Sequence, residues 1–135
     1  RKEEPFMQNN KIVLHFLNGG ITKGFTEDFF PNKNKFHLRD KNTGKVTEID
    51  ILQLKGIFFV KNFDGNKEYK ENNNTERIGL GKRIMISFKD GETIRGYTSG
   101  YSPERSGFFA FPSDPQSNME RVFVLKSATA DIKFI

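Results

Sequence analysis

The feature that most constrains this sequence is an internal repeat with an offset of 72 residues. Residues 12–36 align without a gap on residues 84–108, and seven of the twenty-five aligned pairs are identical. The identities fall on core and turn residue types, and a repeat of this kind predicts two structural units of the same type. The identical pairs are Ile12/Ile84, Phe16/Phe88, Gly19/Gly91, Gly24/Gly96, Thr26/Thr98, Pro31/Pro103 and Phe36/Phe108.

The repeat also sets the expected boundaries of the units. Past residue 36 the register slips by about three residues, as expected from a loop insertion, and each unit then ends in a similar apolar segment. We therefore expect a first unit over residues 11–60 and a second over residues 82–135. Residues 61–81 have balanced charge and a run of asparagines, which predicts a polar linker or a long surface loop. Residues 1–10 are expected to form a tail, and the initial arginine suggests a piece of a longer protein.

Each unit shows the pattern of a β-protein and no amphipathic helix. Apolar residues alternate with others over residues 12–16 and 84–88, which predicts strands with one buried face. Asn18-Gly19 and Asp90-Gly91 follow directly and predict tight hairpin turns. Further strands are expected at 21–29, 36–38, 46–51 and 54–60, and at 93–101, 108–111, 122–125 and 129–135.

Two details of these strands predict how they pack. Gly24 and Gly96 lie in the middle of the second strand of each unit, where a glycine indicates a bend or a close backbone approach. In Phe58-Phe59, adjacent side chains point to opposite faces, so both faces of that strand need cover, from the other unit or from a partner. We therefore expect an all-β fold, either two tandem five-stranded small barrels, Src-homology-3-like in type, packed together, or one duplicated barrel-like sheet.

The segment from Ile84 to Tyr101, IMISFKDGETIRGYTSGY, resembles the first motif of Sm-like proteins, and residues 12–29 resemble it more weakly. The whole chain also resembles a bacterial family of uncharacterised duplicated domains associated with signalling proteins. The Sm resemblance implies a small barrel, RNA binding and oligomeric rings. Of the positions at which that family contacts nucleotides, only Asn34 keeps a matching residue; Phe30 and Ser102 stand where the family has aspartate.

Composition and charge exclude several classes of function. The chain has no cysteine, which excludes disulfides, thiolate metal sites and a cysteine nucleophile. It has no apolar run of the ~18 residues that a membrane span requires. We therefore expect a cytoplasmic location and no membrane insertion. The net charge of +5 is spread over both units. One basic stretch stands out and is a candidate anion or nucleic-acid contact: Lys33, Lys35, Arg39, Lys41 and Lys45.

No catalytic constellation is recognisable, and an enzyme is not expected. His15 and His37 lie in predicted strands and have no counterparts in the other unit, which indicates ordinary surface histidines. GLGKR at 79–83 lacks the spacing and the hydroxyl residue of a phosphate loop. We expect no catalytic residue, no metal ligand and no cofactor.

The sequence therefore predicts a non-catalytic interaction module with a protein as its partner, and the family resemblance implies that it works in a bacterial regulatory or signalling protein. Its candidate contact residues cluster at the duplicated corner of the barrel: Phe29, Phe30 and Lys33, with Tyr101 and Arg105. Packing of these aromatic residues into the core is the alternative interpretation. RNA binding, with an aromatic residue stacking on a base, and sensing of a cyclic dinucleotide remain alternative functions, and an oligomer is possible.

Overall fold

Ten β-strands make up almost all of the regular structure in residues 10–65 and 68–135, the residues that the computed structural model describes. The prediction of an all-β chain is confirmed, since the other elements are two short 3-10 turns, Ile51–Gln53 and Lys126–Ala128. The strands are β1 (Lys11–Phe16), β2 (Ile21–Phe25), β3 (Lys35–Asp40), β4 (Val46–Asp50), β5 (Leu54–Val60), β6 (Lys82–Phe88), β7 (Thr93–Thr98), β8 (Gly107–Pro112), β9 (Met119–Leu125) and β10 (Thr129–Phe134).

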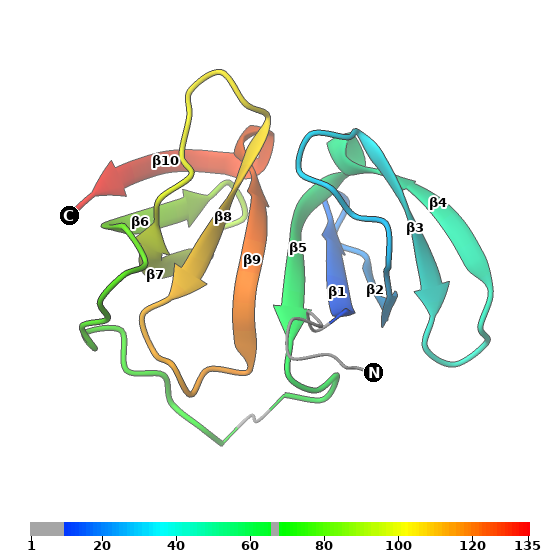
Figure 1. Cartoon of the computed structure of the whole chain (residues 1–135), viewed down its shortest axis with the longest axis horizontal. Helices are drawn as coiled ribbons and strands as arrows, with labels where there is room; N and C mark the ends of the chain where they lie inside the picture. The colour runs from blue at the N-terminus through cyan, green and yellow to red at the C-terminus, as the bar shows by residue number, and fades with distance from the viewer. Residues whose placement is uncertain (1–9, 66–67) are drawn as a thin grey trace.

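All ten strands join in one open antiparallel sheet, in the order β10-β6-β7-β8-β9-β5-β1-β2-β3-β4. The strands expected for two separate barrels are thus continuous, because β5 of the first half pairs with β9 of the second. Ile57 lies opposite Phe123 in this seam, and Phe58 opposite Val122. β5 and β9 lie side by side at the centre of the molecule (Figure 1).

The seam explains why both faces of β5 are apolar. Every residue of β5 is buried. Phe58 packs into a core cluster made mainly by the second half, whereas Phe59 packs into the other cluster, made mainly by the first. In return, Phe123 and Leu125 of β9 belong to the cluster of the first half. Each half therefore completes the core of the other, as the Phe58-Phe59 pair predicted.

The two hairpins that follow β1 and β6 have the same loop geometry. Gly19 N–H donates to Phe16 O at 3.0 Å, and Phe16 N–H donates to Gly20 O at 2.9 Å, which closes a three-residue loop. Gly91 and Phe88 make the equivalent bonds in the second half. The glycines have φ of 94° and 96°. The loops are thus one residue longer than the predicted tight turns, and the glycine takes the left-handed position of that loop type.

Gly24 and Gly96 are required by a close backbone approach, as predicted. A Cβ on Gly24 would collide with the carbonyl oxygen of Arg39 in β3, and one on Gly96 with that of Phe111 in β8. Both residues lie where the second strand of each half first pairs with the third: Gly24 opposite Asp40, and Gly96 opposite Pro112.

β2 and β7 end earlier than the sequence pattern predicts, at residues 25 and 98 rather than 29 and 101. In the second half, the Thr98 hydroxyl donates to Phe109 O at 2.7 Å and accepts from Gly100 N–H at 3.2 Å. These bonds turn the chain out of the sheet. The apolar residues beyond them pack from loops.

The segment expected to be a linker lies against the second half and is held by polar contacts. The Tyr69 hydroxyl donates to the buried Asp114 carboxylate, the Ser117 hydroxyl donates to Glu71 at 2.9 Å, and Arg77 donates to Pro112 O at 2.9 Å. Hydrogen bonds thus fix a segment that has little apolar surface. Of the predicted tail, residues 1–10, only Asn10 is described.

β4 and β10 form the two free edges of the sheet, and both carry charged side chains. Glu48 of β4 pairs with Lys35 at 3.9 Å, and Lys133 of β10 pairs with Asp131 at 3.6 Å. Charges on an edge strand oppose pairing with further strands. Within the described residues, no helix is long and apolar enough to cross a bilayer.

Candidate binding site

The predicted contact residues divide into packed and exposed members. Phe29 lies against the core of the first half, with its ring 5.1 Å from that of Phe123. Tyr101 packs on Phe108 at 5.2 Å, beside the core of the second half. Phe30, in contrast, is 48% exposed, and the Lys33 ammonium lies 5.2 Å from its ring centroid. Arg105 is exposed as well. A docked partner could touch these three exposed residues directly.

The two duplicated corners meet at one cavity. The β2–β3 loop and the β7–β8 loop both lie at the top of Figure 1, on either side of the β9–β5 seam. A cavity of about 270 Å³ lies between them. It is lined by aromatic rings, two arginines and no carboxylate: Pro31, Ser99, Gly100, Arg105, Gly107, Phe108, Phe109, Phe111, Arg121 and Phe123.

Arg121 is the residue at this cavity that the sequence reasoning missed. Its guanidinium lies 4.2 Å from the ring centroid of Phe59 and 4.6 Å from that of Phe109. The side chain is half-buried, and the guanidinium has no hydrogen bond or ion pair to any described residue. Burial lowers the pKa of Arg121, and the charge of Glu120 offsets part of that effect. The available signal was a cation directly before the apolar run at residues 122–125 of β9.

The basic stretch is spread along β3 and its turns rather than gathered. Lys35 pairs with Glu48, and the Arg39 guanidinium lies 4.7 Å from the Phe25 ring centroid. His37 Nδ1 lies 2.7 Å from the Asp28 carboxylate, and this hydrogen bond raises the pKa of His37. Lys33 lies at the β2–β3 corner, whereas Lys41 and Lys45 lie in the turn at the other end of β3. Acidic neighbours therefore offset part of the charge of this stretch.

An ion cluster around the buried side chain of Lys55 joins the two halves near the seam. Lys55 of β5 has a side chain that is 9% exposed, and its ammonium donates to Asp90 at 2.7 Å and to Glu92. Both carboxylates lie at the β6–β7 hairpin. Burial is the largest single effect on the pKa of Lys55 and lowers it, but the hydrogen bonds and charges of the two carboxylates together outweigh burial and raise the pKa. The 35-residue separation leaves no local pattern in the sequence that would predict this contact.

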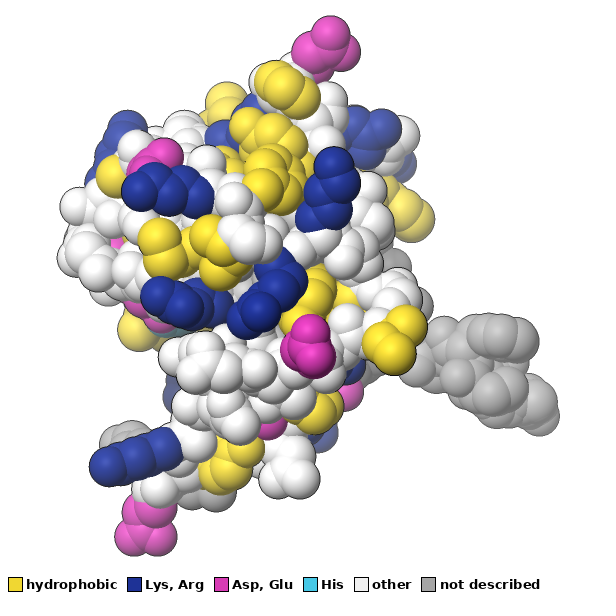
Figure 2. Space-filling view, turned by 90° about the vertical axis from the view of Figure 1, so that its left-hand side faces the viewer, with side chains coloured by type: hydrophobic (Ala, Val, Ile, Leu, Met, Phe, Trp, Pro, Cys, Tyr) yellow, Lys and Arg dark blue, Asp and Glu magenta, His cyan; other side chains and the backbone are white. Residues whose placement is uncertain are grey.

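A further exposed surface combines apolar and basic side chains at β10 and β6. Phe134 is 50% exposed and Ile135 is 55% exposed, and the Lys82 ammonium lies 5.9 Å from the Phe134 ring centroid. Figure 2 shows this side of the molecule, where Lys and Arg side chains surround hydrophobic ones. Apolar patches on a surface often mark contacts with other molecules.

Comparison with protein-family models places the chain in a family. Residues 8–135 match the model of a protein family described as a family of unknown function, DUF6982. No curated protein and no solved structure matches the chain.

Proposed function

We propose that this chain, which belongs to the DUF6982 family of unknown function, is a non-catalytic interaction module that binds an acidic segment of a partner protein. The segment would enter the cavity between the β2–β3 and β7–β8 loops. One observation carries the proposal: Arg121 is a half-buried cation that lies against the rings of both Phe59 and Phe109, and its guanidinium has no hydrogen-bonding acceptor among the described residues.

The chemistry of Arg121 favours a carboxylate ligand. A guanidinium presents donors in a planar fork that fits a carboxylate, and such charge-assisted bonds strengthen where water is excluded. Arg105 lines the same cavity and adds a second cation. The walls formed by Phe109, Phe111 and Phe123 suit an apolar side chain next to that carboxylate. The preferred ligand is therefore a peptide segment in which acidic and large apolar residues alternate.

The proposal treats residues 11–60 and 82–135 as two Sm-like units that share one sheet. The first two strands of each half pair in the same register, which supports this view: Ile12 lies opposite Gly24 in the first half, and Ile84 opposite Gly96 in the second. Acidic neighbours along β3 disfavour RNA as the main ligand, because phosphate binding requires net positive charge along the path of the strand.

Fluorescence anisotropy tests the proposal with three labelled probes: the peptide Glu-Phe-Glu-Leu-Glu, its counterpart with glutamine in place of glutamate, and an oligouridine. We expect the acidic peptide to bind best. Arg121→Gln should weaken it about tenfold or more, since it removes a charge-assisted bond worth ~1.5–3 kcal/mol.

Lys89→Gln, in the exposed β6–β7 turn, is the matched control and should change nothing. Equal binding of both peptides would contradict the proposal. Tighter binding of oligouridine, with a steep dependence on salt, would instead favour nucleic acid as the ligand.

A further inference from the structure

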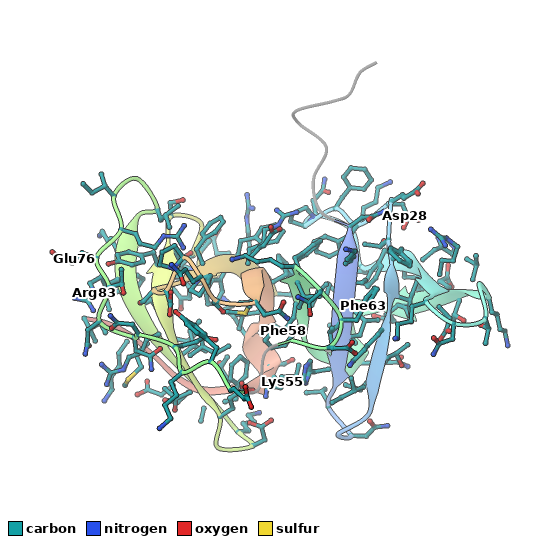
Figure 3. The ribbon with its side chains drawn as sticks, turned by 90° about the horizontal axis from the view of Figure 1, so that it is seen from below. Asp28, Lys55, Phe58, Phe63, Glu76 and Arg83 are labelled. Atoms are coloured by element: carbon teal, nitrogen blue, oxygen red, sulfur yellow. The ribbon has the colours of Figure 1, made fainter. Side chains whose placement is uncertain are left out.

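A second and larger cavity lies between the two halves, apart from the arginine–aromatic cavity. Its volume is about 460 Å³, which is within the range of small-molecule sites. His15 and Phe58 of the first half form one wall, and β7 of the second half forms another. Figure 3 shows Phe58 and Lys55 at the centre of the molecule, between the halves.

Two sets of contacts hold the walls of this cavity in place. The Lys55 ammonium ties β5 to Glu92, a residue of the lining. Glu71 lines the cavity from the 61–81 segment and accepts a hydrogen bond from Ser117 at 2.9 Å. The site is therefore preformed, and a ligand would not have to order these groups.

The lining carries charges of both signs that do not pair with each other. The Arg95 guanidinium has no hydrogen bond or ion pair to any described residue. Glu71 and Glu92 lie in the same lining, and each uses one carboxylate oxygen in the contacts given above. Thr93 and Ile94 pair with β6 but, within the described residues, have no partner on β8, so a strand edge also faces this region.

The remaining lining is apolar or neutral. Phe58, Val60, Ile94 and Met119 provide an apolar surface. His15 stacks on Phe58 with ring centroids 4.5 Å apart, and burial and the charge of Lys55 lower its pKa, with Glu92 and Asp90 opposing them. The lowered pKa favours the neutral imidazole, which offers one donor and one acceptor.

From this arrangement we infer that the cavity between the halves binds a small zwitterion of the amino-acid type. Its ammonium group would lie toward Glu71 and Glu92, and its carboxylate toward Arg95. Its apolar side chain would lie against Phe58 and Met119. This site does not depend on the proposed peptide-binding function, because it uses none of the residues of the arginine–aromatic cavity.

Calorimetry with three related probes tests the inference: L-phenylalanine, phenylalaninamide, which lacks the carboxylate, and 3-phenylpropionate, which lacks the ammonium group. We expect L-phenylalanine to bind at least tenfold more tightly than either analogue. Arg95→Gln should reduce its affinity to that of the amide and leave the amide unchanged.

Lys89→Gln, in the exposed β6–β7 turn and outside both cavities, is the control and should have no effect on these ligands. The ring signals of His15 in an NMR titration should shift with L-phenylalanine, which locates the binding. Equal affinity for all three probes, no binding at millimolar concentration, or an Arg95→Gln variant that binds as the unaltered protein does would each overturn the inference.

Discussion

Gly24 and Gly96 show how a single side-chain atom constrains this sheet. Each glycine lets a neighbouring strand approach so closely that a Cβ would overlap with a backbone carbonyl oxygen. Backbone cannot rotate away as a flexible side chain can, so the cost of a methyl group at these positions is strain in the sheet itself.

We expect Gly96→Ala to lower the free energy of unfolding by about 2 to 3 kcal/mol, as measured by urea denaturation. Gly100→Ala is the matched control, since a Cβ there meets nothing within 4 Å. The control should stay within about 0.5 kcal/mol of the unaltered protein. Equal stability of the two variants would show that the close approach at β8 relaxes at little cost.

The two histidines should respond to pH in opposite directions. His15 has a lowered pKa in the folded state, so its contribution to stability is lost as the pH falls below about 6.5, the unfolded value. His37 has a raised pKa, so its stabilising contribution is present below about 6.5 and is lost as the pH rises through the folded value.

Thermal melts between about pH 5 and pH 7 separate the two effects, because each single variant keeps one histidine. The His37→Gln variant should become more stable as the pH rises, and the His15→Gln variant should become less stable. The same slope in both variants would refute the assignment.

Residues that matter through local geometry could be predicted from the sequence, whereas those that matter through distant contacts could not. Gly24 and Gly96 stand at equivalent positions of the repeat, and their role was visible there. Arg121 and Lys55 act through residues that lie far away in the chain. Arg121 contacts the ring of Phe59, and Lys55 pairs with the β6–β7 hairpin. No periodicity or spacing reports such contacts.

At the scale of elements, Lys55 is the charged contact that ties β5 to the β6–β7 hairpin. Its side chain is buried, while Asp90 and Glu92 are about half exposed. Removing the carboxylates would leave a buried cation without a partner, which costs more than the loss of the ion pairs themselves.

The double variant Asp90→Asn with Glu92→Gln should therefore melt several degrees below the unaltered protein. Adding Lys55→Met should restore most of that loss, because an apolar side chain suits the position over Phe88. Differential scanning calorimetry of the double and triple variants checks this. A triple variant less stable than the double variant would contradict it.

The pH dependence of this contact has a definite sign. Lys55 lowers the pKa of Asp90 in the folded state. The stability that the ionised Asp90 contributes is present above about pH 4, the usual pKa of an aspartate. It is lost as the pH falls through the lower pKa of Asp90 in the folded state.

The positions of the strands could be predicted well, but the ends of β2 and β7 could not. Alternation of apolar residues locates a strand in the sequence. The apolar residues beyond Phe25 and Thr98, including Phe29 and Tyr101, continue to pack against the core from loops. Hydrophobic pattern alone does not distinguish a loop that packs on the core from a strand that continues.

At the scale of the whole molecule, the shared cores predict one cooperative unit. Phe123 belongs to the second half but is fully buried in the core of the first. We expect Phe123→Ala to destabilise the protein by about 3 to 5 kcal/mol. The same loss of stability should be measured whichever half of the molecule is followed during unfolding.

Two probes report on different parts of the chain. All three tyrosines lie beyond residue 60, so tyrosine fluorescence follows the second half, while far-UV circular dichroism follows the whole sheet. Their urea transitions should coincide in the unaltered protein and in the variant. Separate transitions would mean that the halves unfold independently.

The charges on the free edges should limit self-association. With the offset of 75 residues that relates the last two strands of each half, Glu48 of β4 corresponds to Phe123 of β9, and Lys133 of β10 to Phe58 of β5. The variant Glu48→Phe with Lys133→Phe places the apolar side chains of the seam on both edges. We expect it to self-associate more strongly than the unaltered protein in analytical ultracentrifugation, whereas Lys89→Phe, in the exposed turn, should not.

The Phe58-Phe59 pair predicted that the halves pack together, and a single duplicated sheet was one of the two expected architectures, but the strands that join the halves were not predictable. Pairing of β5 with β9 joins segments about 60 residues apart, and no repeat or alternation specifies which two edges meet. Two packed barrels and one shared sheet have the same apolar pattern.

The pairing of β5 with β9 also bears on how the chain is made. A ribosome releases β5 long before β9, so the strand with two apolar faces waits without its neighbour while most of the second half is still being synthesised. During that interval the nascent chain exposes a strand edge suited to aggregation. Slow translation through residues 61–125 would lengthen this exposure, and a chaperone that covers β5 would reduce aggregation of the nascent chain.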